Sequence, residues 1–180
     1  VTETGLKPFD DQRTILIGSS TGGPDAVEQV MSELPAGDCR VIITQHMPEA
    51  FTARFADRLD ESSRYDVKEA TDGTRIGAGE AVVARGGSHT EITGYSNGRI
   101  RIGLIEEDLG LSVHPAVDVT MQSAAEMITD PMTGVILTGM GSDGADGICA
   151  IQEAGGRTVA QDEASCVIYG MPKRAVEAGC

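Results

Sequence analysis

Three segments of this sequence place a serine, a histidine and an aspartate shortly after apolar runs. Ser20 follows the run at 14–18, His46 follows the run at 40–45, and Asp143 follows the run at 133–139. A hydroxyl, an imidazole and a carboxylate are the three groups that an activated serine needs. We therefore predict Ser20 as nucleophile, His46 as base and Asp143 as the acid that orients the base.

The loop that carries Ser20 is consistent with two kinds of chemistry. Gly18-Ser19-Ser20-Thr21-Gly22 satisfies G-x-S-x-G, in which small neighbours allow a tight turn that exposes the central hydroxyl. The helix expected from Pro24 would add N–H groups and positive potential for an oxyanion. Glycine turns before helices also hold phosphates. The loop, however, lacks G-x-x-x-x-G-K-[ST], G-x-G-x-x-G and a nearby lysine, so the sequence favours the nucleophile.

The base and the acid each have competitors. His46 could instead cap the helix that follows it, while His89 and His114 could line a cleft, although neither follows a clear core strand. Asp146 lies nearer the next helix, where a carboxylate serves as an N-terminal cap, so its position favours Asp143 as the acid. The chain order Ser, His, Asp differs from the Ser, Asp, His order of α/β-hydrolases and argues against that fold.

Alternating strands and helices are expected to bring these segments together. Short apolar runs predict buried strands at 14–18, 40–45, 133–139 and 157–161. The segment 65–107 is rich in glycine and β-formers, and Asn97-Gly98 within it is a hairpin signal. Strands that alternate with helices form parallel sheets, whose carboxyl ends share one edge. The three candidate residues are therefore expected at that edge.

Helical periodicity predicts which faces of the intervening helices are buried. The helices are expected from Pro24, from Pro48, over 114–128, around 148–154 and within GMPKRAVEAG, with Asp118 on the third of them. The residues predicted to face inward are Val27, Val30, Met31, Leu34, Phe51, Phe55, Leu59, Val117, Met121, Ala124, Ile128, Ile148, Ile151 and Ala154.

Length and charge narrow the class of protein. A chain of 180 residues suits one domain, predicted over 13–180, after a polar tail or linker at 1–12. The formal net charge of −14 argues against nucleic acid and anionic membranes as partners. The sequence contains no run of 18 apolar residues, so no membrane span is expected. Only three of the 14 cationic residues are lysine, which fits either a salty cytoplasm or ordinary solubility charge.

The cysteines and histidines show no metal-ligand pattern. Cys39, Cys149, Cys166 and Cys180 form no C-x-x-C pair, and the three histidines are far apart in the sequence. No zinc site is therefore expected. We interpret the cysteines as reduced, mostly buried thiols of a cytoplasmic protein.

Five segments together resemble the catalytic domain of the chemotaxis receptor methylesterases (protein-glutamate methylesterases). They are IGSSTGGP, ITQHMPEAFTARFADRLD, SVHPAVDV, GVILTGMGSDGADG and AQDEASCVIYGMP, which run in the family's order from about residue 15 to 172. The resemblance implies Ser20, His46 and Asp143 as the catalytic residues and the Met140 N–H as an oxyanion donor. To these we add the Thr21 N–H, which follows the nucleophile.

The resemblance also implies a fold and an activity. The fold is an α/β, doubly wound, mostly parallel sheet with helices on both faces and an antiparallel hairpin. The activity is hydrolysis of glutamyl methyl esters on the cytoplasmic helices of chemoreceptors, with glutamine deamidation as a second reaction and without a cofactor. A helical substrate requires an open cleft, and Arg54, Arg58 and Arg85 are either a local basic patch or solvated arginines.

Three departures from the family pattern affect what can be expected. Family members carry a receiver domain that works with a histidine kinase, whereas at most 12 residues precede the first strand here. The chain is therefore expected to be an excised domain or an unregulated one. It stops at Cys180, where family chains continue to a further strand and helix, so its C-terminal end is expected to be incomplete. The segment ARGGSHTEI replaces a proline-containing turn and leaves the contribution of His89 open.

Overall fold

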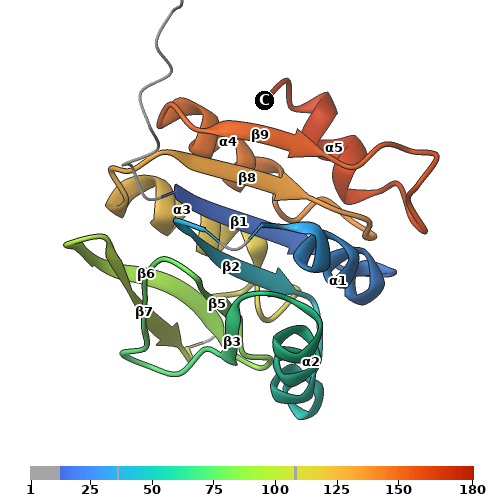
Figure 1. The fold of residues 1–180 in the computed structure, drawn as a ribbon. Coiled ribbons are helices and arrows are strands. Elements are labelled where there is room, and N and C mark those ends of the chain that lie inside the picture. The colour runs from blue at the N-terminus through green and yellow to red at the C-terminus, as the bar shows by residue number, and fades with distance from the viewer. Residues whose placement is uncertain (1–12, 36, 108) are drawn as a thin grey trace, which may run out of the picture.

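Two sheets and their covering helices make up the described part of this chain (Figure 1). The structure, a computed structural model, describes residues 13–35, 37–107 and 109–180. The tail or linker predicted at 1–12 lies outside these residues. One sheet has six strands and is parallel throughout, while the other has three antiparallel strands.

The parallel sheet places β1 and β2 near its centre. Its strands, in their order across the sheet, are β3 (Asp66–Glu69), β5 (Glu80–Val83), β2 (Cys39–Gln45), β1 (Arg13–Ser19), β8 (Met132–Ile136) and β9 (Arg157–Ala160). β1 pairs with both β2 and β8, and the register sets Ser19 opposite Gln45. The short apolar runs become these central strands because strands covered on both faces are apolar along their whole length.

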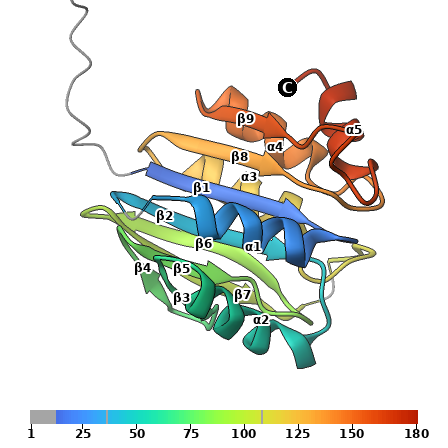
Figure 2. The ribbon, with the colours of Figure 1, turned by 45° about the vertical axis from the view of Figure 1, so that its right-hand side comes forward.

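Helices cover both faces of the parallel sheet (Figures 1 and 2). On one face, α1 (Gly23–Glu33) and α2 (Glu49–Ser62) pack over Ile17 of β1. On the other face, α3 (Val117–Met127), α4 (Ala145–Glu153) and α5 (Met171–Glu177) pack over the core that contains Leu16. Adjacent residues of one strand thus enter opposite cores, as strand geometry requires. The predicted doubly wound arrangement is confirmed.

The second sheet is the predicted antiparallel hairpin with one short strand added. It consists of β4 (Arg75–Ile76), β7 (Arg99–Ile105) and β6 (His89–Ser96), in that order, and β6 packs against α3. Asn97 and Gly98 join β6 to β7 with φ values of 51° and 70°. Asparagine and glycine tolerate these positive φ values, which a tight hairpin turn requires.

Several predicted boundaries and faces differ from the structure. The helix predicted from 114 begins at Val117, and the strand predicted to 139 ends at Ile136, beyond which the Thr138 N–H donates to the Gln161 side chain at 2.7 Å. Phe51 is 57% exposed, because the buried face of α2 begins at Thr52 and continues through Phe55, Ala56 and Leu59, which leaves Phe51 beside that face. Ala154 is exposed because α4 ends at Glu153.

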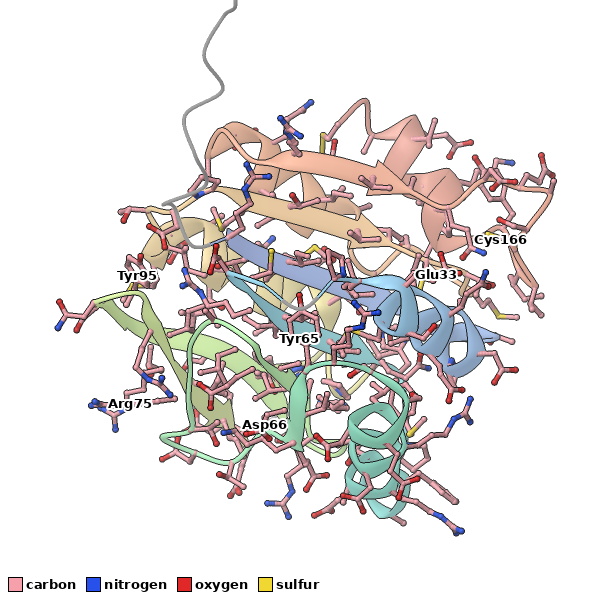
Figure 3. All side chains as sticks on the ribbon, in the orientation of Figure 1. Glu33, Tyr65, Asp66, Arg75, Tyr95 and Cys166 are labelled. Atoms are coloured by element: carbon pink, nitrogen blue, oxygen red, sulfur yellow. A yellow bond between two sulfur atoms is a disulfide. The ribbon has the colours of Figure 1, made fainter. Side chains whose placement is uncertain are left out.

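The interpretation of all four cysteines as reduced thiols is wrong for two of them. Cys149 of α4 and Cys180 form a disulfide with a Cα–Cα distance of 5.1 Å. Their separation of 31 positions conceals the pairing in the sequence, since the packing of α5 against α4 is what returns the chain to Cys149. Cys39 and Cys166 are free, and Cys166 lies on the loop between β9 and α5 (Figure 3).

Candidate active site

The carboxyl ends of β1, β2 and β8 meet at one edge of the parallel sheet, where α/β proteins place their sites. Ser20 follows β1 and His46 follows β2, and the His46 N–H donates to the Ser19 carbonyl at 3.0 Å. On the other side, the Ser20 N–H donates to the carbonyl of Thr138, just beyond β8, at 3.0 Å. The predicted nucleophile therefore lies between the segments that carry the predicted base and acid.

His46 and Asp143 are in direct contact. His46 Nε2 lies 2.6 Å from Asp143 Oδ2, and both side chains are largely buried, with 12% and 14% exposed. Because Nε2 faces a carboxylate it carries the proton, which leaves Nδ1 to accept a proton from a hydroxyl. Within the described ranges, the Ser20 hydroxyl forms no hydrogen bond with His46. The distance between Ser20 and His46 therefore depends on their backbones, which the bond from the His46 N–H to the Ser19 carbonyl joins.

Hydrogen bonds keep Asp143 ionised. Burial alone would raise its pKa, but His46 and the N–H groups of Val117 (2.6 Å) and Asp118 (2.9 Å) donate to its oxygens. These bonds outweigh burial and hold the pKa of Asp143 below its usual value. The group is therefore an anion at neutral pH and can stabilise a charged imidazole.

Asp143 and Asp118 exchange helix caps. Asp143, which precedes α4, accepts the first N–H groups of α3, while Asp118, in the first turn of α3, accepts the N–H groups of Gly144 (2.9 Å) and Gly147 (2.7 Å) at the start of α4. Each carboxylate therefore satisfies donors that the other helix leaves open. The sequence placed Asp118 on α3 but contained no signal of its partner.

The raised pKa of Asp118 is expected to make the free energy of unfolding depend on pH. Burial raises its pKa to about 6; the Gly147 N–H opposes that rise and the charge of Asp143 adds to it. An unfolded aspartate titrates near 3.9, so the folded state binds this proton more tightly, and the free energy of unfolding increases as the pH falls from about 6 to about 4. In Asp118→Asn, we expect this increase to shrink by about 1–2 kcal/mol, allowing for solvent screening of a partly exposed carboxyl.

Urea unfolding of both proteins between pH 4 and pH 7 measures this difference. The asparagine keeps the oxygen that Gly144 and Gly147 contact, so the two proteins differ mainly in the titrating proton. Equal pH slopes in the two proteins would contradict the assignment.

The two predicted oxyanion donors are backbone groups beside Ser20. Gly139 approaches Ser20 so closely that a Cβ on it would lie 2.8 Å from Ser20 Cβ, and Met140 follows it directly. Thr21 is the residue after Ser20. In the part of the chain that the structure describes, the N–H groups of Thr21 and Met140 donate to no protein acceptor. Both donors are therefore open to a ligand at this edge.

A cavity of about 310 Å³ opens beside the His46–Asp143 pair. Besides these two residues, it is lined by Leu111, Ser112, Val113, Ala116, Asp118, Met140, Gly141 and Ser142. A slightly larger cavity of about 380 Å³ lies between α1 and the segments after β8 and β9, but its lining contains no histidine. The chemistry of the lining therefore favours the smaller cavity as the substrate site.

The competing candidates lie elsewhere. His89 is buried, with Nδ1 accepting the Ala116 N–H at 3.1 Å and its ring 4.5 Å from that of His114, so it braces the turn before α3. Neither of these histidines lines the 310 Å³ cavity. Asp146 is exposed in the first turn of α4. No group of three or more metal-ligating side chains suited to an ion occurs among the described residues.

Ion pairs neutralise two of the three candidate basic-patch residues. Arg58 pairs with Asp25 and Glu28, and Arg85 pairs with Glu49. Arg54 is exposed on α2. The alternative of solvated arginines fits these positions better than a patch for an acidic substrate.

Comparison with known proteins identifies the family. The family model described as CheB methylesterase matches residues 15–180. The chain belongs to the CheB methylesterase family. The crystal structure of the Thermotoga maritima CheB methylesterase catalytic domain superposes with a TM-score of 0.86 at 40% identity, covering 92% of this chain and 88% of that one. The resemblance drawn from the five segments and the predicted fold are confirmed.

Two relatives share the name protein-glutamate methylesterase/protein-glutamine glutaminase. The Halobacterium salinarum protein is 57% identical over 173 residues, which is 96% of this chain and 50% of the relative. The Haloarcula marismortui protein is 62% identical over 168 residues, which is 93% of this chain and 46% of the relative. This CheB-family chain thus spans about half the length of these relatives.

Proposed function

We propose that this CheB-family domain hydrolyses glutamyl methyl esters on the cytoplasmic helices of chemoreceptors, giving glutamate and methanol in chemotaxis adaptation. The observation that carries the proposal is the contact of His46 with Asp143 at 2.6 Å, at the sheet edge where Ser20 follows β1. The names of the relatives, which match nearly the whole of this chain, support the same reaction.

In the first half-reaction, Ser20 becomes acylated. His46 Nδ1 takes the Ser20 hydroxyl proton as Oγ attacks the ester carbonyl, and Asp143 stabilises the resulting imidazolium through Nε2. The N–H groups of Met140 and Thr21 bind the oxyanion, and one such donor contributes about 3 kcal/mol to the transition state. Collapse of the tetrahedral intermediate breaks the bond to the methoxy group, which leaves as methanol with the proton from His46.

In the second half-reaction, water regenerates the serine. His46 removes a proton from water as the water oxygen attacks the acyl carbonyl, and the same N–H groups bind the second oxyanion. The Ser20 oxygen then leaves with the proton held by His46, which releases the receptor glutamate. The ester and one water molecule supply all the atoms of methanol and glutamate, so neither half-reaction needs a further reactant.

The surroundings of the site fit an ester carried on a helix. The 310 Å³ cavity has exposed apolar side chains at its rim, with Leu111 40% and Met140 68% exposed. Such side chains can contact the aliphatic part of a methylated glutamate while the reacting carbonyl reaches Ser20. We infer that the reaction takes place in the cytoplasm. A receiver domain and a histidine kinase would control it in a full-length protein. None of the helices in the described ranges has the length and apolar character needed to span a bilayer.

Release of methanol from methylated receptor fragments tests the proposal. Wild-type protein is expected to release methanol in proportion to the methylated glutamates supplied, and fragments that were never methylated should release none. If methanol stays at the background level while the protein is folded, the methylesterase proposal is wrong.

Deamidation of receptor glutamines is a second candidate, favoured by the glutaminase part of the names of the relatives. The same steps apply, but ammonia is a poorer leaving group than methanol and requires a more complete proton transfer from His46. We therefore expect slower ammonia release from glutamine-bearing fragments than methanol release from methylated ones.

A further inference from the structure

The side chain of Gln45 connects the segments that carry the nucleophile and the base. Gln45 is the last residue of β2, with 2% of its surface exposed. Its Nε2 donates to the carbonyls of Ser20 (2.9 Å) and His46 (3.0 Å), and its Oε1 accepts from the Ser19 hydroxyl at 2.6 Å. One buried carboxamide thus holds the main chain of both residues.

The chemistry of its neighbours fixes the orientation of this carboxamide. Two of its three partners are backbone carbonyls, which only accept, so the nitrogen must face them. The oxygen then faces the Ser19 hydroxyl, which can donate. A rotated amide would place its oxygen against the two carbonyl oxygens and its nitrogen against the hydroxyl, losing two of the three hydrogen bonds. The carboxamide therefore has a single favourable orientation.

Both the N–H and the carbonyl of Ser20 are hydrogen-bonded. Its N–H donates to Thr138, while its carbonyl accepts from Gln45 Nε2 and from the Gly23 N–H at 2.8 Å. Gly23 packs directly on the carboxamide, since a Cβ there would overlap Gln45 Oε1 and lie 2.8 Å from Ser19 Oγ. Of the groups that bond to the main chain of Ser20, namely those of Thr138, Gly23 and Gln45, only the Gln45 side chain also bonds to His46.

We propose that Gln45 is a positioning residue that sets the distance between Ser20 and His46. The inference rests on the proposed function, in which His46 takes the Ser20 proton. No hydrogen bond between these two side chains fixes their approach in the described residues, so their backbones must do so. Proton transfer and attack need the reacting groups within a few tenths of an ångström of their best positions, and a displacement of about 1 Å costs about a hundredfold in rate.

Gln45→Glu tests the proposal with a side chain of the same shape. The carboxyl keeps an acceptor for Ser19 but, once ionised, presents oxygen to both carbonyls. We expect kcat for methanol release to fall about a hundredfold with little change in KM, because Gln45 does not contact the cavity. A protonated carboxyl can donate to one carbonyl, so the activity of the variant relative to wild type should fall further as the pH rises.

Thr44→Val is the matched control on the same strand. Thr44 is buried next to Gln45 in the sequence, and its hydroxyl contacts Thr120 at 3.2 Å, away from the backbones of Ser20 and His46. This variant also loses a buried polar contact, so it reports what destabilisation alone does. We expect its kcat to stay within about threefold of wild type. Circular dichroism and thermal melts of both variants establish that each is folded at the assay temperature.

Labelling by a serine-directed phosphonate gives a second measurement that does not require a receptor. Its rate should fall in Gln45→Glu by about the same factor as kcat. The proposal is overturned if kcat and the labelling rate of Gln45→Glu stay within about threefold of wild type, if Thr44→Val loses as much, or if the deficit does not vary with pH. A wild-type protein without methanol release would instead refute the proposed function.

Discussion

Replacing Ser20 by alanine is expected to lower methanol release by a factor on the order of 10⁵–10⁶. The change removes the hydroxyl that we propose as the nucleophile and leaves the backbone contacts of residue 20 to Thr138, Gly23 and Gln45 in place. The fold should therefore persist while the acyl-enzyme can no longer form. Single-turnover methanol release from a methylated receptor fragment measures the loss.

Ser19→Ala is the natural control for this experiment. Ser19 directly precedes Ser20 as the last residue of β1, but it is fully buried and its hydroxyl donates to Gln45. A phosphonate should label wild type and Ser19→Ala but not Ser20→Ala. Methanol release by Ser20→Ala at the wild-type rate would show that another group is the nucleophile. Absence of labelling in a folded wild-type protein would favour a catalytically silent docking protein.

Asp143→Asn is expected to lower kcat by about 10⁴-fold. The change removes the negative charge beside His46 Nε2, so the imidazolium formed during attack is no longer stabilised. An amide nitrogen at the Oδ2 position would also donate to Nε2, which would move the imidazole proton to Nδ1 and block proton transfer from Ser20. Steady-state kinetics of methanol release measure the effect.

Asp146→Asn is the matched control, because Asp146 lies three positions further along and is exposed in the first turn of α4. We expect less than a threefold change in its kcat, as for surface substitutions that touch no reacting group. Asp143→Asn should also lose stability, because either amide orientation sets its nitrogen against the N–H of Val117 or of Asp118. A larger fall in kcat for Asp146→Asn than for Asp143→Asn would reverse the assignment of the acid.

Local pattern was enough to predict the central strands and the sheet edge that carries the candidate site. The apolar runs before Ser20 and His46 became adjacent parallel strands, and Asn97-Gly98 became the hairpin turn. Both features depend on residues that are close together in the sequence. A strand buried on two faces is a continuous apolar run, and a hairpin turn with positive φ favours Asn-Gly. The family resemblance then extended the prediction from separate segments to the whole sheet.

The features that the sequence did not reveal all depend on partners that are distant along the chain. Gln45 stands next to His46, but its importance comes from the strand register that sets it beside Ser19 and Ser20. The cap that Asp118 gives to α4 and the disulfide of Cys149 with Cys180 depend on how helices pack. The spacing of four residues from Phe55 placed Phe51 inward, but the packed α2 buries Thr52 instead.

The exchange of caps between Asp118 and Asp143 has a consequence for how the protein folds. Asp143 reaches His46 only from a loop whose carboxylate is tied to α3 and whose following helix is capped from α3. The acid therefore cannot take its place before α3 and α4 have docked on each other. During refolding, the recovery of esterase activity should coincide with the docking of this helix pair and follow the formation of the sheet. The recovery of activity therefore reports the docking of α3 against α4.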